Sequence, residues 1–243
     1  MKSFRDFTVQ KIVNLKNDDE ITESLTEKIM SNSIIVEEDN NISLTDNPDY
    51  LKDDPEIVGY YDSEQQENVY FLATKGKLSL SEKVSILDFG CGRGDLFNFL
   101  KSYGLPFDYI GIEKSESLVK VGKEKYPDVN IVNDSYHLLE IKDEYNSDWV
   151  LNIGNLNLNY GYARQSFDKY DEFVNLLDIS MHFAKVGVTF VLLEDNLGNN
   201  SYIHHPIHEI TKLLKERFPM YRYDISYTDI ENVYILNILA ETW

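Results

Sequence analysis

The feature that most constrains the fold is a short apolar run that ends in a glycine-rich loop. Residues 84–89 read VSILDF, and three glycines follow at alternate positions, Gly90, Gly92 and Gly94. A continuous apolar run of this length, closed by glycines, is typical of a parallel strand buried on both faces. The glycines permit a tight turn and let backbone N–H groups approach a ligand closely. The pattern therefore predicts a central strand, then a ligand-binding loop, then a helix.

The spacing of the glycines narrows the choice of ligand. A dinucleotide-binding loop reads G-x-G-x-x-G, and the N-terminus of its helix faces a pyrophosphate. Here the third glycine comes one residue early, and Asp95 occupies the position of the fingerprint glycine. A carboxylate at that place would oppose a pyrophosphate, and no Lys-Ser/Thr pair follows as in a Walker loop. The loop therefore disfavours an NAD-dependent oxidoreductase.

After this loop, predicted strands and helices alternate along the chain. Further strands are expected at 109–113, 129–132, 148–153, 186–193, 221–227 and 233–239. Helices are expected at 96–103, 116–126, 168–183 and 206–218. The last two strands are only about five residues apart, so they must form a hairpin, and one strand runs antiparallel to its neighbours. This order predicts an α/β fold with a doubly wound sheet and one reversed strand.

The negative charge of the chain is concentrated towards its N-terminus. The 243 residues carry a net charge of −19, and residues 17–67 hold sixteen acidic and two basic residues, which is −14 of that total. We interpret residues 1–82 as an acidic, partly helical N-terminal extension. Helices are expected there at 21–30 and 64–75, with a short strand at 34–36. The acidic surface is either simply solvated or a docking surface for a basic protein partner.

Composition excludes several classes of protein. No apolar run approaches the roughly 18–20 residues that span a bilayer, and the first residues lack the apolar stretch of a signal peptide. The single cysteine, Cys91, excludes a disulfide framework and a multi-cysteine zinc site. We therefore expect a cytoplasmic protein with no membrane partner. Because so acidic a chain repels phosphate backbones, we expect no nucleic-acid partner either.

At Asp88–Gly94 the sequence resembles the class I S-adenosylmethionine-dependent methyltransferases. The motif is Asp-x-Gly-x-Gly-x-Gly at the end of the first buried strand, and the likeness covers about residues 84–239. It implies an S-adenosylmethionine-binding methyltransferase domain over residues 83–243. It also implies a seven-stranded sheet of order 3-2-1-4-5-7-6, with strand 7 antiparallel, behind the acidic N-terminal extension.

A closer likeness is to the small stand-alone methyltransferases common in phage and bacterial genomes. In those proteins a Gln-containing helix precedes the glycine loop, and here Gln65 and Gln66 precede it. A Ser-Gly-x-Phe-Asn run follows their fourth strand. The corresponding run here is Ile-Gly-Asn-Leu-Asn at 153–157, in which Gly154 and Asn157 match while the Ser and the Phe are replaced.

The resemblance implies roles for the residues around the loop. Those that would hold the methionine moiety of S-adenosylmethionine are Asp88, Gly90, Cys91, Gly92 and Gly94. Those that would contact the adenosine are Glu113, Lys114, Asp134 and Ser135. Glu113 ends the second strand, and its two carboxylate oxygens suit hydrogen bonds from both ribose hydroxyls.

Methyl transfer needs an acceptor atom aligned with the methyl group and the sulfur, so no catalytic triad is required. Residues 152–157 would form the floor beneath the methyl group, beginning with the cofactor-binding Asn152. The residues that we assign to the acceptor are Asn155, Asn157 and Tyr160. Polar residues at the same edge of the sheet are Glu194, Asp195, Asn196, His204, His205 and His208. His204 and His208 could form a metal pair, but we expect no metal site because Pro206 places His204 before the helix.

The run NIGNLNLNYG at 152–161 is expected to be a mobile loop over the methyl group. Its leucines alternate with asparagines, so one face would cover the cofactor while the amides face the acceptor. The alternative is a plain extension of the fourth strand.

The predicted function is S-adenosylmethionine-dependent methyl transfer to a small molecule or a protein. Methyltransferases of nucleic-acid amino groups carry Asn/Asp-Pro-Pro-aromatic after the fourth strand, and this chain has no proline there. The alternative function is a non-catalytic binding module of the same fold. Such a module would dock through its acidic N-terminal region, for instance in a phage assembly.

Overall fold

The computed structural model describes residues 60, 62–135, 142–157, 169–194, 203–230 and 232–240. All of them lie in one unit of the chain, Ser43–Trp243. The predicted helix at 21–30 and the predicted strand at 34–36 lie outside the described residues. Most of the acidic segment 17–67 also lies outside them, since residues 1–59 are not described. The role of that segment therefore stays a prediction.

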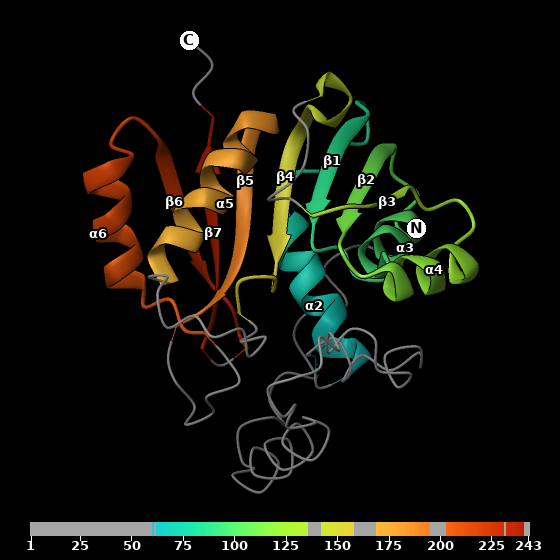
Figure 1. The fold of residues 1–243 in the computed structure, drawn as a ribbon, viewed down its shortest axis with the longest axis horizontal. Helices are drawn as coiled ribbons and strands as arrows, with labels where there is room; N and C mark the ends of the chain where they lie inside the picture. The colour runs from blue at the N-terminus through green and yellow to red at the C-terminus, as the bar shows by residue number, and fades with distance from the viewer. Residues whose placement is uncertain are drawn as a thin grey trace, which may run out of the picture. The chain divides into compact units, whose positions relative to one another are not determined.

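In the described part of the chain, seven strands form one mixed sheet (Figure 1). They are β1 (Val84–Phe89), β2 (Phe107–Glu113), β3 (Ile131–Asn133), β4 (Ser147–Ile153), β5 (Ala184–Leu193), β6 (Arg222–Tyr227) and β7 (Val233–Leu239). Their order is β3-β2-β1-β4-β5-β7-β6. Strand β7 runs antiparallel to both of its neighbours, β5 and β6. The predicted strand order and the predicted reversed strand are confirmed.

Helices cover both faces of the sheet. The described helices are α2 (Ser63–Thr74), α3 (Asp95–Ser102), α4 (Glu116–Lys125), α5 (Lys169–Phe183), α6 (Ile207–Arg217) and the short 3-10 helix η5 (Asp143–Tyr145). Apolar side chains of α3 and α4 pack with Ile86 and Leu151 on one face. Those of α5 and α6 pack with Leu87, Phe89 and Val188 on the other. Neighbouring strand residues thus point to opposite cores, as expected for a sheet buried on both sides.

Strand β1 lies at the centre and brings the predicted site residues to one edge of the sheet. It pairs in parallel with β2 and β4, so that Asp88 lies level with Gly111 and Leu151. The other end of β1 is fixed to β4, because Asp148 Oδ2 accepts hydrogen bonds from Ser85 N at 2.7 Å and from Ser85 Oγ at 2.8 Å. Since parallel strands end at the same edge, the segments that follow β1, β2 and β4 are neighbours.

Two elements differ from the sequence-based expectation. Helix α2 packs on the sheet through Val69 and Ala73, which lie against Val191 and Ile235. This helix, which the sequence assigned to the N-terminal extension, therefore contributes to the core of the sheet. Strand β3 begins later than predicted, because the residues that pair with β2 are Ile131–Asn133.

Helix α4 packs directly against the backbone of the glycine loop. A Cβ atom on Gly122 would lie 2.4 Å from the carbonyl oxygen of Arg93 and 2.9 Å from Ile131 Cδ1. The first contact is to backbone, which cannot move aside as a flexible side chain can. The absence of a side chain at Gly122 therefore lets α4 approach the loop closely.

We predict that Gly122→Ala destabilises the protein by roughly 1–3 kcal/mol, the range for overpacking a close contact. The physical reason is the clash with the Arg93 carbonyl. Chemical denaturation of both proteins measures the change. Lys123→Ala, at the exposed neighbouring position of α4, is the matched control and should change stability by less than about 0.5 kcal/mol. Equal stability of Gly122→Ala and the control would contradict this account of the packing.

Candidate functional site

The glycine loop folds back over the end of β2. Gly90, Gly92 and Gly94 all have positive φ angles, which glycine adopts readily because it lacks a Cβ. The N–H groups of Gly90 and Cys91 both donate to the carbonyl oxygen of Ile112, at 2.8 and 3.2 Å. The loop is thereby fixed against the strand that carries Glu113.

Glu113 meets the loop directly. Its Oε2 accepts a hydrogen bond from Gly92 N at 3.0 Å, and its Oε1 accepts one from Ser115 N at 2.8 Å. The side chain is buried, and burial raises the pKa of Glu113 while these two N–H donors oppose the rise. Each carboxylate oxygen keeps a second lone pair, so the group can still accept hydrogen bonds from two hydroxyls of a ligand.

Asp88 lies beneath the loop at the end of β1. It is 3% exposed, and its Oδ2 accepts a hydrogen bond from the Tyr109 hydroxyl at 2.7 Å. Burial raises the pKa of Asp88 to about 7; the Tyr109 hydrogen bond opposes this rise and the nearby Glu113 adds to it. Near neutral pH, Asp88 is therefore poised between its charged and neutral forms.

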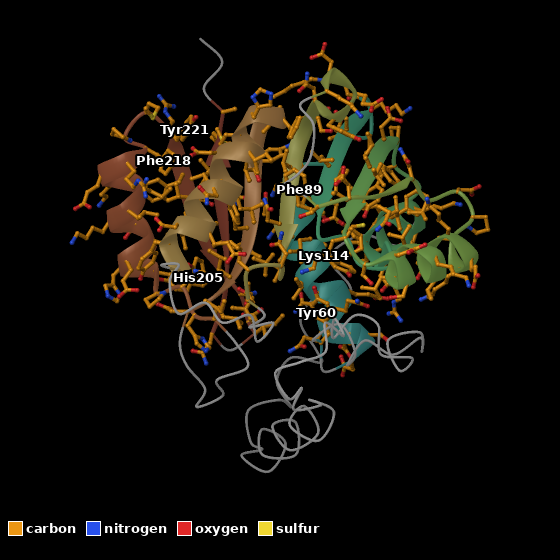
Figure 2. All side chains as sticks on the ribbon, viewed as in Figure 1. Tyr60, Phe89, Lys114, His205, Phe218 and Tyr221 are labelled. Atoms are coloured by element: carbon orange, nitrogen blue, oxygen red, sulfur yellow. The ribbon has the colours of Figure 1, made fainter. Side chains whose placement is uncertain are left out.

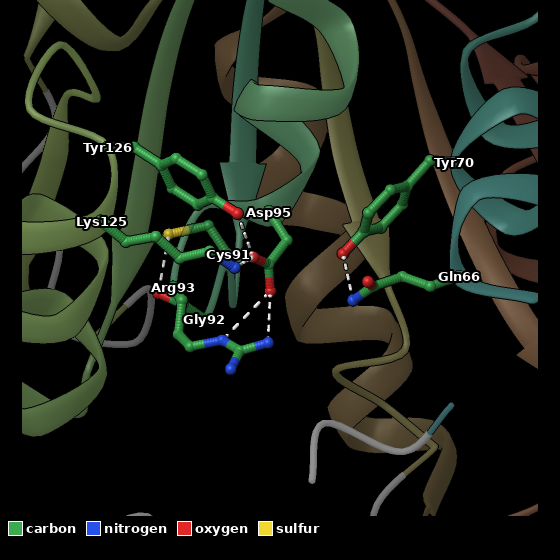
Figure 3. A network of polar contacts seen from close by, with 8 residues as sticks. All are labelled: Gln66, Tyr70, Cys91, Gly92, Arg93, Asp95, Lys125 and Tyr126. Carbon is green, nitrogen blue, oxygen red and sulfur yellow. Dashed lines mark hydrogen bonds and ion pairs between the residues drawn. The ribbon is translucent and has the colours of Figure 1, made fainter. Parts of the chain in front are cut away.

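Asp95, by contrast, is fully paired (Figure 3). Its Oδ2 accepts from Arg93 Nη2 at 2.9 Å and from Nε at 3.2 Å, and its Oδ1 accepts from Tyr126 at 2.7 Å and Lys125 at 3.2 Å. Burial acts to raise the pKa of Asp95, but Arg93, Tyr126 and Lys125 together lower it. The carboxylate at the start of α3 is thus neutralised within the protein. Sequence reasoning named Asp95 but missed its partner Arg93, which is buried.

Strand β4 ends at Ile153, and a turn follows in which Asn157 N donates to Gly154 O at 3.0 Å. The run to Asn157 is therefore a turn and not an extension of β4. Leu156 is buried in the core on the α5 face, so it anchors the turn. The remaining residues of the predicted loop, 158–161, lie outside the described residues.

Three asparagines of this segment form a connected set. Asn155 Nδ2 donates to Phe89 O at 3.1 Å and to Asn152 Oδ1 at 3.4 Å, while Asn152 Nδ2 donates to Ser180 Oγ at 3.1 Å. Asn155 also lies against the glycine loop, because a Cβ atom added to Gly90 would be 2.9 Å from the Cβ atom of Asn155. The structure therefore brings Asn155 and Gly90 together, with the buried Asn152 side chain behind them.

The Asn157 side chain is directed towards β5. Its Nδ2 donates to Val191 O at 3.1 Å, and its Oδ1 has no hydrogen-bond partner among the described residues. The side chain is buried. A buried amide oxygen without a partner is costly, so a ligand group that donates a hydrogen bond would be stabilising there.

The other predicted cofactor residues lie after β2 and β3. Lys114 follows the end of β2 and is exposed, and Figure 2 shows it near the middle of the view, above Tyr60. Asp134 Oδ1 accepts a hydrogen bond from Ser135 N at 2.7 Å. Asn133 was missed by sequence reasoning, although its Nδ2 donates to the carbonyls of Glu113 and Lys114 at 3.0 and 3.1 Å.

Cys91 turns towards β2 and away from solvent. A Cβ atom on Gly111 would lie 2.5 Å from Cys91 Sγ, so the thiol fills the space that this glycine leaves. Burial, followed by the charges of Asp88 and Glu113, raises the pKa of the Cys91 thiol well above its usual value. The thiol is therefore neutral, and the backbone N–H of Cys91 is already bonded to the Ile112 carbonyl oxygen at 3.2 Å.

At the end of β5, His205 ties the segment before α6 to the turn after β4. Its ring Nε2 lies 3.3 Å from Leu156 O, and its backbone N–H donates to Leu193 O at 2.7 Å. His208 is exposed, and Glu209 accepts a hydrogen bond from Tyr170. Within the described ranges, no group of three His, Cys, Asp or Glu side chains is placed to hold a metal ion. Tyr160, Asp195 and Asn196 lie outside those ranges.

None of the helices in the described segments is both long enough and apolar enough to span a bilayer.

We predict that Asp88→Asn stabilises the ligand-free protein at pH 8. Because folding raises the pKa of Asp88 to about 7, its contribution to stability is full below about pH 4 and is lost as the pH rises through 7. The variant should therefore melt at a higher temperature than the wild type at pH 8, and the difference should shrink towards pH 5. Asp148→Asn is the matched control and should not stabilise at either pH. A variant less stable than the wild type at pH 8 would refute this account of Asp88.

Comparisons with known proteins were made by sequence and by fold. No protein-family model matches the chain. The curated protein "Putative methyltransferase 235L" of Invertebrate iridescent virus 6 is 31% identical over 68 residues. That match spans 28% of this chain and 24% of the viral protein, so the chain matches about a quarter of that relative's length.

Solved structures match over most of the chain. The plantazolicin methyltransferase BpumL in complex with S-adenosylhomocysteine has a TM-score of 0.54 at 15% identity, covering 91% of this chain and 99% of that chain. An S-adenosylmethionine-dependent methyltransferase from Aquifex aeolicus has a TM-score of 0.51 at 14% identity, covering 73% and 93%. Magnesium protoporphyrin IX methyltransferase from Synechocystis PCC 6803 with bound S-adenosylhomocysteine has a TM-score of 0.50 at 16% identity, covering 75% and 90%. Together with the strand order, these matches show that the chain has the fold of the class I S-adenosylmethionine-dependent methyltransferases.

Proposed function

We propose that this protein is an S-adenosylmethionine-dependent methyltransferase whose cofactor lies at the carboxyl ends of β1 and β2. The observation that carries the proposal is the meeting of the glycine loop with an acidic residue, in which Gly92 N donates to the Glu113 carboxylate at 3.0 Å. The glycine backbone allows a ligand to approach closely, and the Glu113 carboxylate can accept hydrogen bonds from two hydroxyls of that ligand. Both lie at the edge of the sheet where doubly wound folds bind ligands. S-adenosylmethionine supplies the electrophilic methyl group.

The residues around the loop fit the parts of this cofactor. The Glu113 carboxylate would accept hydrogen bonds from both ribose hydroxyls, since each of its oxygens has a lone pair beyond the one used by Gly92 or Ser115. Lys114 would lie beside the adenine, and Asp134 would accept from the adenine amino group, with Ser135 next to it. The residues that would hold the methionine moiety are Asp88, Gly90, Cys91, Gly92 and Gly94.

The turn after β4 would present the methyl acceptor. The Asn157 amide nitrogen donates to Val191 O, and the buried Oδ1, which has no partner among the described residues, would accept a hydrogen bond from the acceptor. Asn155 lies against Gly90 and would border both the methyl group and the acceptor. Asn152 is a positioning residue in this proposal, because its side-chain Oδ1 accepts a hydrogen bond from the Asn155 side-chain amide. Tyr160 is proposed from the sequence alone as a further residue that contacts the acceptor.

We propose a small molecule, a peptide or a protein as the acceptor. The similar solved proteins that are named for what they act on include the plantazolicin methyltransferase and the magnesium protoporphyrin IX methyltransferase. The net charge of −19 disfavours a nucleic-acid acceptor, since phosphates would be repelled. The alternative of a non-catalytic docking module gains no support from the described residues, because nearly all of its acidic segment lies outside them.

We predict that Glu113→Ala weakens S-adenosylmethionine binding by roughly 1.5–3 kcal/mol, the range for a charged hydrogen-bond partner. Glu113→Gln keeps one acceptor oxygen and should lose less. Isothermal titration calorimetry with S-adenosylmethionine measures both. Glu124→Ala, on the exposed face of α4, is the control and should bind as the wild type does. No binding by the wild type would remove the proposed function, whereas unchanged binding by Glu113→Ala would remove only the assignment of this residue.

We predict that Asn157→Ala lowers turnover by roughly 10- to 100-fold, because the acceptor loses its alignment with the methyl group. Its affinity for S-adenosylmethionine should stay within about twofold of the wild type, since the amide faces the acceptor. Turnover is measured as S-adenosylhomocysteine formed with dialysed cell extract as the acceptor source. Asn98→Ala, at an exposed position of α3, serves as the control. A loss of cofactor affinity as large as the loss of turnover would mean that Asn157 belongs to the cofactor site instead.

A further inference from the structure

The turn after β4 carries two buried side-chain oxygens, the Oδ1 atoms of Asn155 and Asn157. Neither oxygen has a hydrogen-bond partner in the described part of the chain. A buried amide oxygen that accepts no hydrogen bond is costly, so two of them in one turn need an explanation. The turn lies at the edge of the sheet where doubly wound folds bind ligands, so a ligand can supply the donors.

The neighbours of the two amide groups identify which end of each is the oxygen. The other end of the Asn155 amide lies 3.1 Å from Phe89 O, and the other end of the Asn157 amide lies 3.1 Å from Val191 O. A backbone carbonyl only accepts hydrogen bonds, so the amide atom that faces it must be the nitrogen in both cases. The two atoms that remain are therefore oxygens, and each can only accept.

The two amides lie on either side of the end of β4. Strand β4 runs between β1 and β5 in the sheet. Asn155 is bonded to Phe89, the last residue of β1, and Asn157 is bonded to Val191 near the end of β5. Both belong to the turn that Asn157 N closes on Gly154 O at 3.0 Å. The pair thus brackets the end of β4, where the proposed function places the methyl acceptor.

Other groups around this turn either use their hydrogens within the protein or offer further lone pairs. Asn152 Nδ2 donates to Ser180 Oγ at 3.1 Å, and Ile203 N donates to Asn157 O at 2.9 Å. Glu194 directly follows β5 and brings a carboxylate to the same edge. The two amide oxygens and this carboxylate suit a ligand group that donates hydrogen bonds.

We propose that the methyl acceptor is a primary amino group, which donates one hydrogen to Asn155 Oδ1 and the other to Asn157 Oδ1. The inference rests on the proposed methyl transfer and deepens it, because it names the class of the acceptor atom. A neutral primary amine carries two hydrogens and one lone pair, so it can serve both oxygens while the lone pair faces the methyl group. A hydroxyl or a thiol has one hydrogen and would leave one oxygen without a donor, and a carboxylate has none.

The reaction strengthens the two hydrogen bonds. The nitrogen lone pair forms a bond to the methyl carbon, the carbon–sulfur bond breaks, and its electron pair stays on sulfur, which becomes a neutral thioether. The nitrogen becomes positively charged, and it releases one proton to water after the transfer. Because N–H groups on a charged nitrogen are stronger donors, the two oxygens stabilise the transition state more than the bound amine.

The experiment uses two analogues of the cofactor in which a nitrogen atom replaces the sulfur and carries an arm in place of the methyl group. One arm is aminoethyl and the other is hydroxyethyl, so they match in length and differ in the hydrogens that they donate. Neither analogue requires that the natural acceptor be known. By calorimetry we expect the wild type to bind the aminoethyl analogue about tenfold more tightly, the scale for one charge-assisted hydrogen bond.

Asn155→Ala and Asn157→Ala should each move the ratio of the two affinities towards one. S-adenosylhomocysteine, which has no arm, should bind both variants within about twofold of the wild type and so reports that they are folded. Asn98→Ala, at an exposed position of α3, is the matched control and should keep the wild-type ratio. The two variants are independent, so the test remains if one of them does not fold.

Equal binding of the two analogues by the wild type would overturn the inference and leave the proposed function in place. So would a preference that survives in both alanine variants, because a general attraction of a cation to this acidic protein does not need the two amides. Failure of the wild type to bind S-adenosylhomocysteine and both analogues would overturn the inference and the proposed function together.

Transfer of an isotope-labelled methyl group to cell extract then shows which kind of molecule carries the amine. The extract is separated into small molecules and proteins after the reaction, and the chemical shift of the labelled methyl group distinguishes nitrogen from oxygen and sulfur. Label on nitrogen in either fraction supports the inference, whereas label on oxygen or sulfur overturns it.

Discussion

The site depends on one contact between the glycine loop after β1 and the last residue of β2, the hydrogen bond from Gly92 N to the Glu113 carboxylate. It exists because β1 and β2 run in parallel and end at the same edge of the sheet. The loop can reach the carboxylate only because Gly90, Gly92 and Gly94 adopt positive φ angles. The same contact couples the backbone that would hold one end of a cofactor to the acid that would hold its ribose.

Two buried acids near this edge of the sheet, Asp95 and Asp88, differ in the groups that pair with them. Asp95 is surrounded by Arg93, Lys125 and the Tyr126 hydroxyl, so its charge is balanced within the protein. Asp88 has a neutral hydroxyl as its hydrogen-bond donor. A protein that balances one buried acid so completely and leaves the next with a neutral donor is suited to a ligand that brings its own positive charge.

Much of the fold and of the cofactor side could be predicted from sequence because the signals are local. The bounds of β1 and β7 were predicted to the residue, since each is a mainly apolar run. Asp88 and Glu113 lie at the ends of such strands, and their roles came from the resemblance of the Asp88–Gly94 motif to the methyltransferases. Arg93, Tyr109 and Asn133 were missed, because an arginine in a loop, a tyrosine within β2 and an asparagine at the end of β3 carry no local pattern that indicates a polar role.

The sequence by itself determined the alternation of strands and helices, the glycine loop and the two acids at the strand ends. It could do so because hydrophobic periodicity and glycine spacing act over a few residues. Only the tertiary structure showed that Asp95 is paired with a cation and a hydroxyl from α4 and its end, because Asp95 meets Lys125 and Tyr126 across thirty or so positions of the chain. It also decided that α2 belongs to the core and that Leu156 is buried, while the Asn157 Oδ1 has no hydrogen-bond partner in the described part of the chain. These outcomes depend on packing between distant segments, which no local pattern of residues encodes.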